Sequence, residues 1–297
     1  MMLLIYNLVL LMLLPIMVTR IAIKGFKDSD YLYNLSNRFG LYKESSKRNL
    51  VWFHAVSLGE VIGSEQLLRK FIENNEIILT VSTPTGLRHA KKLYGNKIII
   101  VYAPWDFFVF VTFFFKKFNP ICLILFETEI WPSMIAIASK RKIPIILSNA
   151  RLSESSLRKY LLLKLFAKNV LNKISIVLAQ SKRHVERFIQ IGVSKDNIKQ
   201  VGSIKFDAIF KKATSSIKIN NDSKYLLAAS THKGEEEIVI DSYCKLLEDF
   251  QNLKMILVPR HPERASSVIE IFKKRKLSAK IISHLNISLG IFLFRSA

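Results

Sequence analysis

Apolar and polar positions alternate regularly from residue 50 onward, where short β-branched apolar runs are each followed by a stretch with helical spacing. Such runs are typical of strands, and near-continuous apolar strands are typical of parallel sheets that are covered on both faces. The alternation therefore predicts βαβ units and an α/β fold. The predicted strands span 49–57, 76–83, 97–103, 120–127, 143–150 and 175–181, and the predicted helices span 60–74, 85–95, 106–119, 131–142, 156–174 and 182–192.

A polar segment at 211–224, "KKATSSIKINNDSK", interrupts this pattern and predicts a linker. The alternation then restarts, with strands at 225–231 and 253–260, a weak third strand at 278–284, and helices at 234–250 and 265–276. A doubly wound domain usually has about five or six strands, so we expect the second domain to be incomplete. The last segment, 285–297, has neither helix caps nor a polar face, and it predicts neither a closing helix nor a tail.

The first eighteen residues, "MMLLIYNLVLLMLLPIMV", are almost wholly apolar and carry no charge. They lack the basic start and small-residue cleavage site of a signal peptide, and their length approaches the ~20 residues of a spanning helix. Arg20, Lys24 and Lys27 follow, which by the positive-inside rule keeps the remainder in the cytoplasm. We favour a membrane anchor or interfacial helix over a buried first helix. The expected divisions are an anchor at 1–20, a first domain at 30–210 and a second at 220–297.

The charge balance is strongly basic, with 45 Lys and Arg against 23 Asp and Glu in 297 residues. This surplus of +22 indicates an anionic partner, although lysines set among Ile and Asn also fit a general compositional bias. The sequence has no zinc-finger, helix-turn-helix or stacked-aromatic signature, so we expect anionic lipid and no nucleic acid. Cys122 and Cys244 lie far apart without metal spacing, as expected in a reducing compartment.

Ligands of open α/β sheets bind outside the carboxyl ends of the strands, so the strand-to-helix turns are the candidate sites. In the first turn, "HAVSLGE", Ser57 and Glu60 have the spacing of a capping box, in which Glu60 reaches back to the Ser57 amide. Gly59 would let a substrate or a neighbouring strand approach closely. These residues alone favour capping and leave open that Glu60 is a catalytic base.

The next turns carry hydroxyls and charges. In "STPTG", the residues Thr83, Thr85 and Gly86 open a helix whose free amides suit an anion, although simple N-capping is the more ordinary explanation. In "FETEIWP", Glu127 and Glu129 end a strand and would face the same side of an extended chain.

Such a carboxylate pair suggests acid–base catalysis or the binding of sugar hydroxyls. The alternative is a structural ion pair with Arg151. Asn149 and Arg151 follow the next strand, where an arginine suits a carboxylate or phosphate.

The second domain offers two further turns. Ser230 and Thr231 lie in "ASTHKG", and Arg260 and His261 lie in "VPRHPER"; either turn could face a nucleotide. A lone histidine more often only makes hydrogen bonds. The aromatic stretch at 105–115, "WDFFVFVTFFF", fits either a lipid-facing helix or a buried one.

Eight of these stretches together resemble one family, the 3-deoxy-D-manno-octulosonic acid (Kdo) transferases of lipopolysaccharide synthesis. The resemblance covers residues from about 33 to 276, and eight motifs in order are far more specific than any one of them. They are "HAVSLGE", "TVSTPTG", "YAPWD", "ETEIWP", "NARLSE", "VGSIKFD", "STHKGEEE" and "PRHPER".

The resemblance implies two Rossmann-like domains of the glycosyltransferase B type, with an acceptor-binding first domain and a donor-binding second one. It implies CMP-Kdo as donor, a lipid A precursor as acceptor, inversion without a metal or cofactor, and anchoring at the cytoplasmic face of the inner membrane. By the same resemblance, Glu60 is the general base, Glu127 or Glu129 belongs to the cleft, and Arg260 contacts the donor. With an unperturbed pKa of about 4.3, Glu60 would be ionised at neutral pH.

The carboxyl-terminal part departs from the family, because nothing after Lys276 matches its nucleotide-site motifs. We therefore expect a truncated donor domain that binds CMP-Kdo poorly alone, or that works with a separate chain. Two other hypotheses stay open: a different lipid-directed nucleotide-sugar glycosyltransferase, and a membrane-bound fragment without activity.

Overall fold

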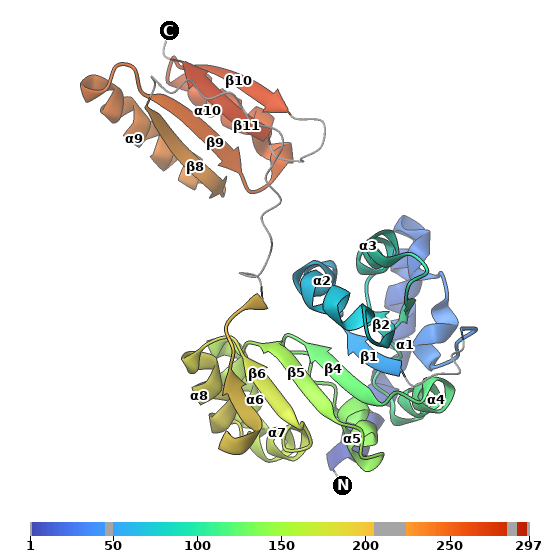
Figure 1. Cartoon of the computed structure of the whole chain (residues 1–297). Coiled ribbons are helices and arrows are strands. Elements are labelled where there is room, and N and C mark those ends of the chain that lie inside the picture. Colours follow the sequence, from blue (N-terminus) through green and yellow to red (C-terminus); the bar gives the residue numbers. More distant parts are fainter. Residues whose placement is uncertain (1, 45–49, 205–223, 284–289, 296–297) are drawn as a thin grey trace. The chain divides into compact units, whose positions relative to one another are not determined.

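The chain divides into two compact units, Met1–Ile209 and Phe210–Ala297 (Figure 1). The computed structural model describes residues 2–44, 50–204, 224–283 and 290–295. The predicted linker, except for its last residue, and the end of the "VGSIKFD" motif lie outside the described residues.

Unit 1 is built on a seven-stranded sheet in the order β3-β2-β1-β4-β5-β6-β7, with every described pair parallel. The order reverses direction between β1 and β4, so these two neighbours form the topological switch point. All strands but β7 were predicted; β7 has three residues, of which only Ile198 is buried, and therefore lacks an apolar run. The strands are β1 (Leu50–His54), β2 (Glu76–Val81), β3 (Ile99–Tyr102), β4 (Cys122–Phe126), β5 (Ile145–Ala150), β6 (Ile176–Ala179) and β7 (Ile198–Gln200).

Helices connect these strands and cover both faces of the sheet. The predicted helix 156–174 is two helices, because the backbone at Leu163 leaves helical geometry (φ −116°, ψ 36°). The helices that follow the first strand are α2 (Leu58–Ile72), α3 (Pro84–Tyr94), α4 (Phe108–Phe118), α5 (Pro132–Lys140), α6 (Glu154–Leu162), α7 (Lys164–Leu171) and α8 (Lys182–Gln190), with the short 3-10 helix η3 (Lys195–Asn197) before β7.

The two faces of the sheet bury two separate cores. Successive side chains of β1 point to opposite faces, so Trp52 packs in one core and Phe53 in the other. Helices α4, α5, α7 and α8 contribute to the core around Trp52, while α2 and α3 contribute to the core around Phe53. The interpretation of the aromatic helix α4 as buried holds for Phe114 and Phe115, which are fully buried, while Phe108 and Phe113 are exposed; the lipid-facing interpretation stays a prediction.

The apolar amino terminus forms one long helix, α1 (Met2–Lys27), which continues seven residues past the expected end of the anchor. Among the described residues it is the one helix that is long and apolar enough to cross a membrane. It is docked on unit 1, since the Tyr6 hydroxyl donates to Asp106 (3.0 Å) and the Asn7 amide donates to Ser133 (3.1 Å). The 3-10 helices η1 (Ser29–Tyr31) and η2 (Leu35–Phe39) lead from α1 to the sheet.

Unit 2 has a four-stranded sheet in the order β10-β11-β9-β8. β8 and β9 are parallel, whereas β11 is antiparallel to both β9 and β10, so the parallel pattern expected from the sequence does not extend to the last two strands. Residues 290–295, for which no regular element was predicted, form β11. The elements are β8 (Tyr225–Thr231), α9 (Glu235–Asp249), β9 (Lys254–Pro259), η5 (Pro262–Arg264), α10 (Ala265–Lys274), β10 (Ser278–Ser283) and β11 (Gly290–Arg295).

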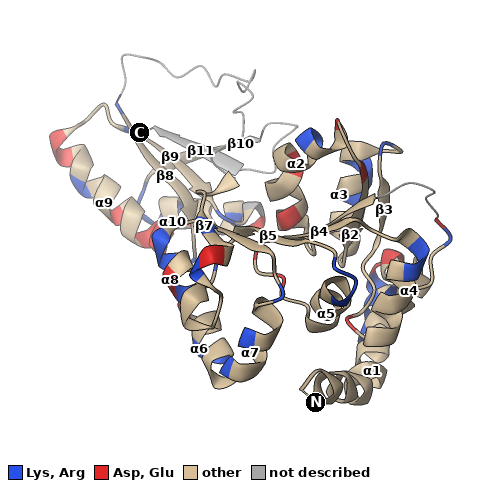
Figure 2. Cartoon of the chain, turned by 60° about the horizontal axis from the view of Figure 1, so that its bottom comes forward, with Lys and Arg blue, Asp and Glu red and all other residues tan. Residues whose placement is uncertain are grey.

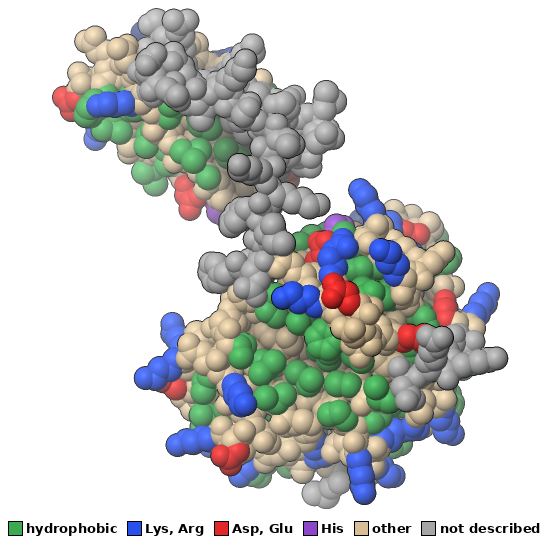
Figure 3. Space-filling view, viewed as in Figure 1, with side chains coloured by type: hydrophobic (Ala, Val, Ile, Leu, Met, Phe, Trp, Pro, Cys, Tyr) green, Lys and Arg blue, Asp and Glu red, His purple; other side chains and the backbone are tan. Residues whose placement is uncertain are grey.

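Lys, Arg, Asp and Glu residues occur along most of the helices (Figure 2). On the face shown in Figure 3, Lys and Arg are dispersed around unit 1 with hydrophobic side chains between them. The positive charge on this face is therefore spread widely and does not form a single stripe.

Candidate active site

The predicted residues of unit 1 follow strands β1, β2, β4 and β5, whose carboxyl ends meet at one edge of the sheet. Glu60 follows β1 and the two other glutamates follow β4, so the acidic residues lie on the two sides of the switch point, where open α/β sheets bind ligands. These residues are Ser57, Gly59, Glu60, Thr83, Thr85, Gly86, Glu127, Glu129, Asn149 and Arg151.

The Glu60 carboxylate is held by two hydrogen bonds at the start of α2. Its Oε2 accepts from the Val56 amide (2.8 Å), and its Oε1 accepts from the Ser57 hydroxyl (2.9 Å). The Ser57 hydroxyl in turn caps the helix by accepting from the Glu60 amide (3.3 Å). The arrangement is a capping box shifted by one residue, because Glu60 reaches Val56 and not the Ser57 amide predicted from the sequence.

Glu60 is 8% exposed, and burial raises its pKa to about 7. The negative charge of Glu129 adds to this rise, and that of Glu127 adds less, while the bonds from Val56 and Ser57 oppose it. The expectation of an ordinary, fully ionised carboxylate at neutral pH is therefore wrong, because the sequence does not show how deeply the side chain is buried or which acids lie beside it. A carboxyl group that titrates near neutrality suits general base catalysis.

Glu127 has a conformation that the sequence did not predict. β4 ends at Phe126, and Glu127 takes a positive φ of 62°, so the argument that Glu127 and Glu129 share one side of an extended strand is wrong. The Glu127 carboxylate pairs with Arg151, which donates from Nε (3.0 Å) and Nη2 (2.9 Å). The ion-pair alternative is thus confirmed, although the Arg151 side chain is 54% exposed and can still meet a ligand.

Glu129 is positioned by the indole of Trp131, whose Nε1 donates to its Oε2 (2.7 Å). Burial raises the pKa of Glu129, and the charge of Glu127 raises it further. The ring of Trp131 meets His54 edge to face at 4.8 Å between centroids. The β1 strand therefore supports, through His54, the tryptophan that holds Glu129.

His54 was not singled out from the sequence, and its surroundings explain why it is no base. It is fully buried, and burial lowers its pKa to about 3. Its Nδ1 lies 2.8 Å from the Thr80 hydroxyl, which also accepts from the indole of Trp52 (2.8 Å). His54 therefore stays neutral and acts as part of a buried polar chain beneath the site.

The start of α3 matches the N-capping interpretation. The Thr83 hydroxyl accepts from the Gly86 amide (3.2 Å), while Thr85 is exposed and its hydroxyl points back to Thr83. A Cβ at Gly86 would lie 2.9 Å from Thr83 Oγ1 and 3.3 Å from the Leu58 amide nitrogen, so the glycine lets α3 approach α2. A Cβ at Gly59 would have only Ser57 Oγ nearby (3.8 Å), so no neighbouring strand approaches this glycine.

Asn149, the next-to-last residue of β5, has a positive φ of 54° and is fully buried. Its side-chain oxygen accepts from the Ile204 amide (3.3 Å), and its carbonyl oxygen accepts from the Gln180 side chain (2.9 Å). Within the described residues its Nδ2 has no hydrogen-bond partner. Asn149 therefore stabilises the end of β5, two residues before Arg151, and does not present its side chain to solvent.

In unit 2, the predicted residues have mixed surroundings. Ser230 is exposed with a positive φ of 65°, and Arg260 and His261 are exposed on the turn after β9. Thr231 is 6% exposed, and its hydroxyl donates to Glu236 (3.3 Å). Glu236 is fully buried and pairs with Arg264 (2.7 Å), a pair that the sequence reasoning missed. Thr231 therefore supports a buried ion pair, and the other three residues remain accessible.

Nothing in the sequence indicated that Asp106, in the motif "YAPWD", holds two helices together. It is 7% exposed and accepts from the amides of Ser133 (2.9 Å) and Met134 (2.8 Å) at the start of α5, and from the Tyr6 hydroxyl of α1. Burial raises its pKa to about 7 despite these bonds. Asp106 therefore joins the amino-terminal helix to the helix that follows the Glu127–Glu129 turn.

The described residues include no group of three or more His, Cys, Asp or Glu side chains placed to hold a metal ion. The chemistry that this edge offers is that of carboxylates and an arginine: proton transfer at Glu60, and contact with an anionic or hydroxylated ligand at Arg151 and Glu129.

Residues 33–208 match the family model described as 3-deoxy-D-manno-octulosonic-acid transferase (kdotransferase). The 3-deoxy-D-manno-octulosonic acid transferase of Haemophilus influenzae is 33% identical over 282 residues, which are 91% of this chain and 66% of that protein. The Rickettsia felis protein of the same description is 32% identical, over 79% of this chain and 52% of its own length. A bifunctional glycosyltransferase/methyltransferase of Fusobacterium nucleatum is 32% identical, over 80% of this chain and 38% of its own length. The chain thus spans between 38% and 66% of the length of these relatives.

Solved structures share the fold. The UDP-GlcNAc 2-epimerase of Neisseria meningitidis, bound to UDP-GlcNAc, superposes with a TM-score of 0.54 at 16% identity, over 76% of this chain and 69% of the epimerase. Another UDP-N-acetylglucosamine 2-epimerase superposes with a TM-score of 0.50 at 12% identity, over 71% of this chain and 61% of that epimerase. At these identities the likeness shows the fold alone, which is an α/β fold of the glycosyltransferase B kind with an added apolar amino-terminal helix.

Proposed function

The chain belongs to the 3-deoxy-D-manno-octulosonic acid (Kdo) transferase family, and we propose that it moves Kdo from CMP-Kdo to a hydroxyl of a lipid A precursor. Family membership supports a glycosyltransferase that handles Kdo in lipopolysaccharide synthesis. The donor nucleotide, the acceptor and the inverting course are our proposal. The observation that carries it is the buried Glu60 carboxyl group at the switch point, with a pKa of about 7.

In the proposed step, Glu60 takes the proton of the acceptor hydroxyl. The freed electron pair of that oxygen forms the bond to the anomeric carbon of Kdo. The bond from this carbon to the phosphate oxygen of CMP breaks on the opposite face, and its electron pair leaves with CMP. Attack and departure on opposite faces invert the anomeric centre, and the step as written needs no metal.

The bonds to Glu60 are compatible with this role. An ionised carboxylate has about four acceptor positions, and Val56 and Ser57 occupy one on each oxygen. They fix the orientation of the carboxylate and leave one lone pair on each oxygen for the substrate hydroxyl. Capping and catalysis are therefore both possible for Glu60.

The other residues of this edge are proposed to line the acceptor cleft. Arg151 is half exposed and would contact an anionic group, and Glu127 would hold its guanidinium in place. Glu129, aimed by Trp131, would accept a hydrogen bond from a sugar hydroxyl and would set the pKa of Glu60. Thr83, Thr85 and Gly86 would shape the wall formed by α3.

We assign donor binding to unit 2. Ser230, Arg260 and His261 are exposed at the carboxyl ends of the parallel strands β8 and β9, where a nucleotide phosphate would meet Arg260. Thr231 is assigned a supporting role, because its hydroxyl is committed to the buried Glu236.

For location, we propose that α1 lies along the cytoplasmic face of the inner membrane and does not span it. The helix contacts unit 1 near its start, through Tyr6 and Asn7, and again near its end, where Lys24 lies over the ring of Tyr31 (5.2 Å). A spanning orientation would carry the buried Asp106 into hydrocarbon, at a high cost for an ionisable group. An interfacial helix keeps both contacts and exposes its apolar side chains to lipid.

Donor competition tests the proposal against a glycosyltransferase that uses another nucleotide sugar. With CMP-Kdo as donor and the lipid A precursor as acceptor, we expect CMP and CMP-sugars to inhibit transfer by the full chain, and UDP-sugars to leave it unchanged. Stronger inhibition by UDP-sugars would reject CMP-Kdo as the donor.

A further inference from the structure

A basic pocket lies between the second half of α1 and the start of α3. It has a volume of about 210 Å³, many times the ~10–15 Å³ that a cavity needs to hold one water molecule, and so it admits a tetrahedral oxyanion with its first substituent. No carboxylate is among the described residues that line it. They are Met17, Arg20, Ile21, Lys24, Tyr31, Arg38, Ser82, Thr83 and Trp105.

Arg38 is the most buried charge of this pocket. It is 3% exposed, its Nη2 donates to the carbonyl oxygen of Ser82 (3.2 Å), and its guanidinium stacks on the ring of Tyr102 at 4.4 Å. Its Nε is buried without a hydrogen-bond partner in the described part of the chain. Besides burial, the titratable groups that act on the pKa of Arg38 are three tyrosines, which are neutral at about pH 7, and no carboxylate. A buried cation with a spare donor and no counter-charge indicates an anionic ligand.

Two further cations come from α1. Arg20 and Lys24 are one turn apart, and they follow directly on the apolar part of the helix. With α1 lying in a membrane interface, these two side chains stand at the depth of lipid headgroups. The start of α3 adds a favourable dipole at the wall formed by Ser82 and Thr83.

Three other side chains that line the pocket are apolar. Met17 and Ile21 are on the same stretch of α1 as the two cations, and Trp105 lies across the pocket. An aromatic side chain beside cations at the end of an apolar helix is typical of a membrane interface. A free inorganic ion would make no use of these three side chains, whereas a lipid that carries a phosphate would contact both parts.

The pocket is joined to the candidate base by backbone hydrogen bonds. The Ser82 amide donates to the Val56 carbonyl oxygen (2.9 Å), and the Val56 amide donates to Glu60 (2.8 Å). Gly86, in the first turn of α3, lets that turn pack against Ser57 and Leu58. A ligand held at Ser82 and Thr83 is therefore next to the loop that carries Glu60.

We propose that this pocket binds a phosphate group carried by a membrane lipid and so presents the rest of that lipid to the Glu60 edge. That the lipid is the acceptor, and that α1 lies at the membrane, rest on the function and location proposed above; that the pocket takes a phosphate rests on its own residues.

The test measures binding without any transfer reaction. The full chain in dodecyl maltoside micelles is titrated by calorimetry with dioctanoyl phosphatidic acid, with dioctanoylglycerol as the lipid that lacks phosphate, and with inorganic phosphate. We expect the phosphatidic acid to bind much more tightly than either reference. R38Q, and separately the double variant R20A/K24A, should each weaken its binding about tenfold, because charge-assisted hydrogen bonds are lost.

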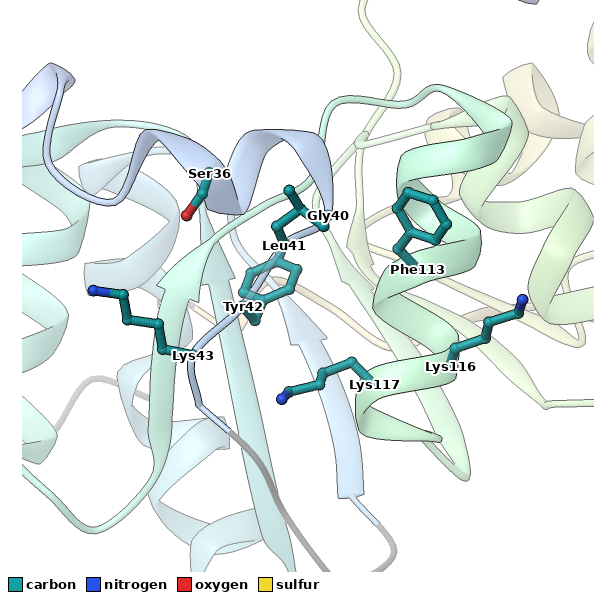
Figure 4. Close-up of a pocket in the computed structure, with 8 residues that line it drawn as sticks. All are labelled: Ser36, Gly40, Leu41, Tyr42, Lys43, Phe113, Lys116 and Lys117. Atoms are coloured by element: carbon teal, nitrogen blue, oxygen red, sulfur yellow. The ribbon is translucent and has the colours of Figure 1, made fainter.

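The control is a second pocket whose lysines belong to the outer surface (Figure 4). It is lined by Lys43 next to Tyr42, and by Lys116 and Lys117 at the end of α4. The double variant K116A/K117A removes the same charge as R20A/K24A and should leave the binding of phosphatidic acid unchanged. An equal loss in both double variants would show general attraction and overturn the proposal.

Two more outcomes decide the matter. Equal affinity for inorganic phosphate and phosphatidic acid would assign the pocket to the free ion and reject the lipid. Unchanged binding in R20A/K24A would reject the pocket even if R38Q failed to fold, because neither Arg20 nor Lys24 is buried in the core. E60Q separates this proposal from the catalytic one, because it should lose transfer and keep the binding of phosphatidic acid.

Discussion

Replacing Glu129 by Gln should move the acid limb of the pH–activity profile to lower pH. With Glu60 as the base, kcat/KM falls as the pH drops through about 7, because protonated Glu60 cannot accept the proton of the acceptor. The rise of this pKa from 4.5 to about 7 corresponds to about 3 kcal/mol, at about 1.4 kcal/mol per unit. Burial supplies the largest share, and the charge of Glu129 the next.

Glu129→Gln keeps the size of the side chain and removes its charge, so burial still holds the Glu60 pKa above its ordinary value. We expect the limb to move by about one unit to the acid side. Ser57→Ala is the matched opposite change, since it removes a hydrogen bond to the Glu60 carboxylate and should move the limb to the alkaline side.

The assay is kcat/KM for Kdo transfer between pH 5 and 9, about two units on each side of neutrality, at constant ionic strength. Thermal melting by circular dichroism checks that each variant stays folded, because Ser57→Ala also loses a helix cap worth about 1 kcal/mol. An acid limb that stays in place in Glu129→Gln, or that moves to the alkaline side, would refute the assignment of Glu60.

Two further predictions concern stability. Gly86→Ala should lower the free energy of unfolding by about 1–3 kcal/mol, because its Cβ would lie 2.9 Å from Thr83 Oγ1. Gly59→Ala is the neutral control, since its Cβ would meet only Ser57 Oγ at 3.8 Å. Equal melting temperatures of the two variants would contradict the close packing of α3 at Gly86. Arg264→Ala should cost about 3–5 kcal/mol, because it leaves the fully buried Glu236 without its charged partner and, among the described residues, with only the Thr231 hydroxyl bonded to its carboxylate. Lys273→Ala breaks an exposed pair with Glu270 and should change melting little, so a similar loss in both variants would argue against the buried pair.

The sequence predicted the sheet of unit 1 well because its strands are buried on both faces. β1 shows this most clearly, since each of its five residues is buried and the run is apolar except for His54. The strand-to-helix turns follow from the same pattern, and the switch-point rule then places Glu60 and Glu129 at one edge. β11 was missed because its segment was judged by helix caps and a polar face, and a strand that pairs with β9 and β10 needs neither.

The details of the site depend on tertiary contacts that a linear pattern does not carry. The positive φ of Glu127 is uncommon for a residue with a side chain, and its residue type gives no sign of it. The raised pKa of Glu60 depends on burial and on Glu129, which is distant in the sequence. In the same way, Asp106 is important because Tyr6 lies about a hundred residues away in the chain and 3.0 Å away in space.

The role of Glu60 as the base is tested most directly by comparing the full chain with its Glu60→Gln variant for Kdo transfer from CMP-Kdo to the lipid A precursor in detergent micelles. We predict product with the inverted anomeric configuration from the unaltered chain, and loss of transfer by at least about a hundredfold in the variant, the usual contribution of a general base. Transfer at equal rates by both chains would contradict the assignment of Glu60, and no transfer by the unaltered chain would contradict the function proposed for this chain.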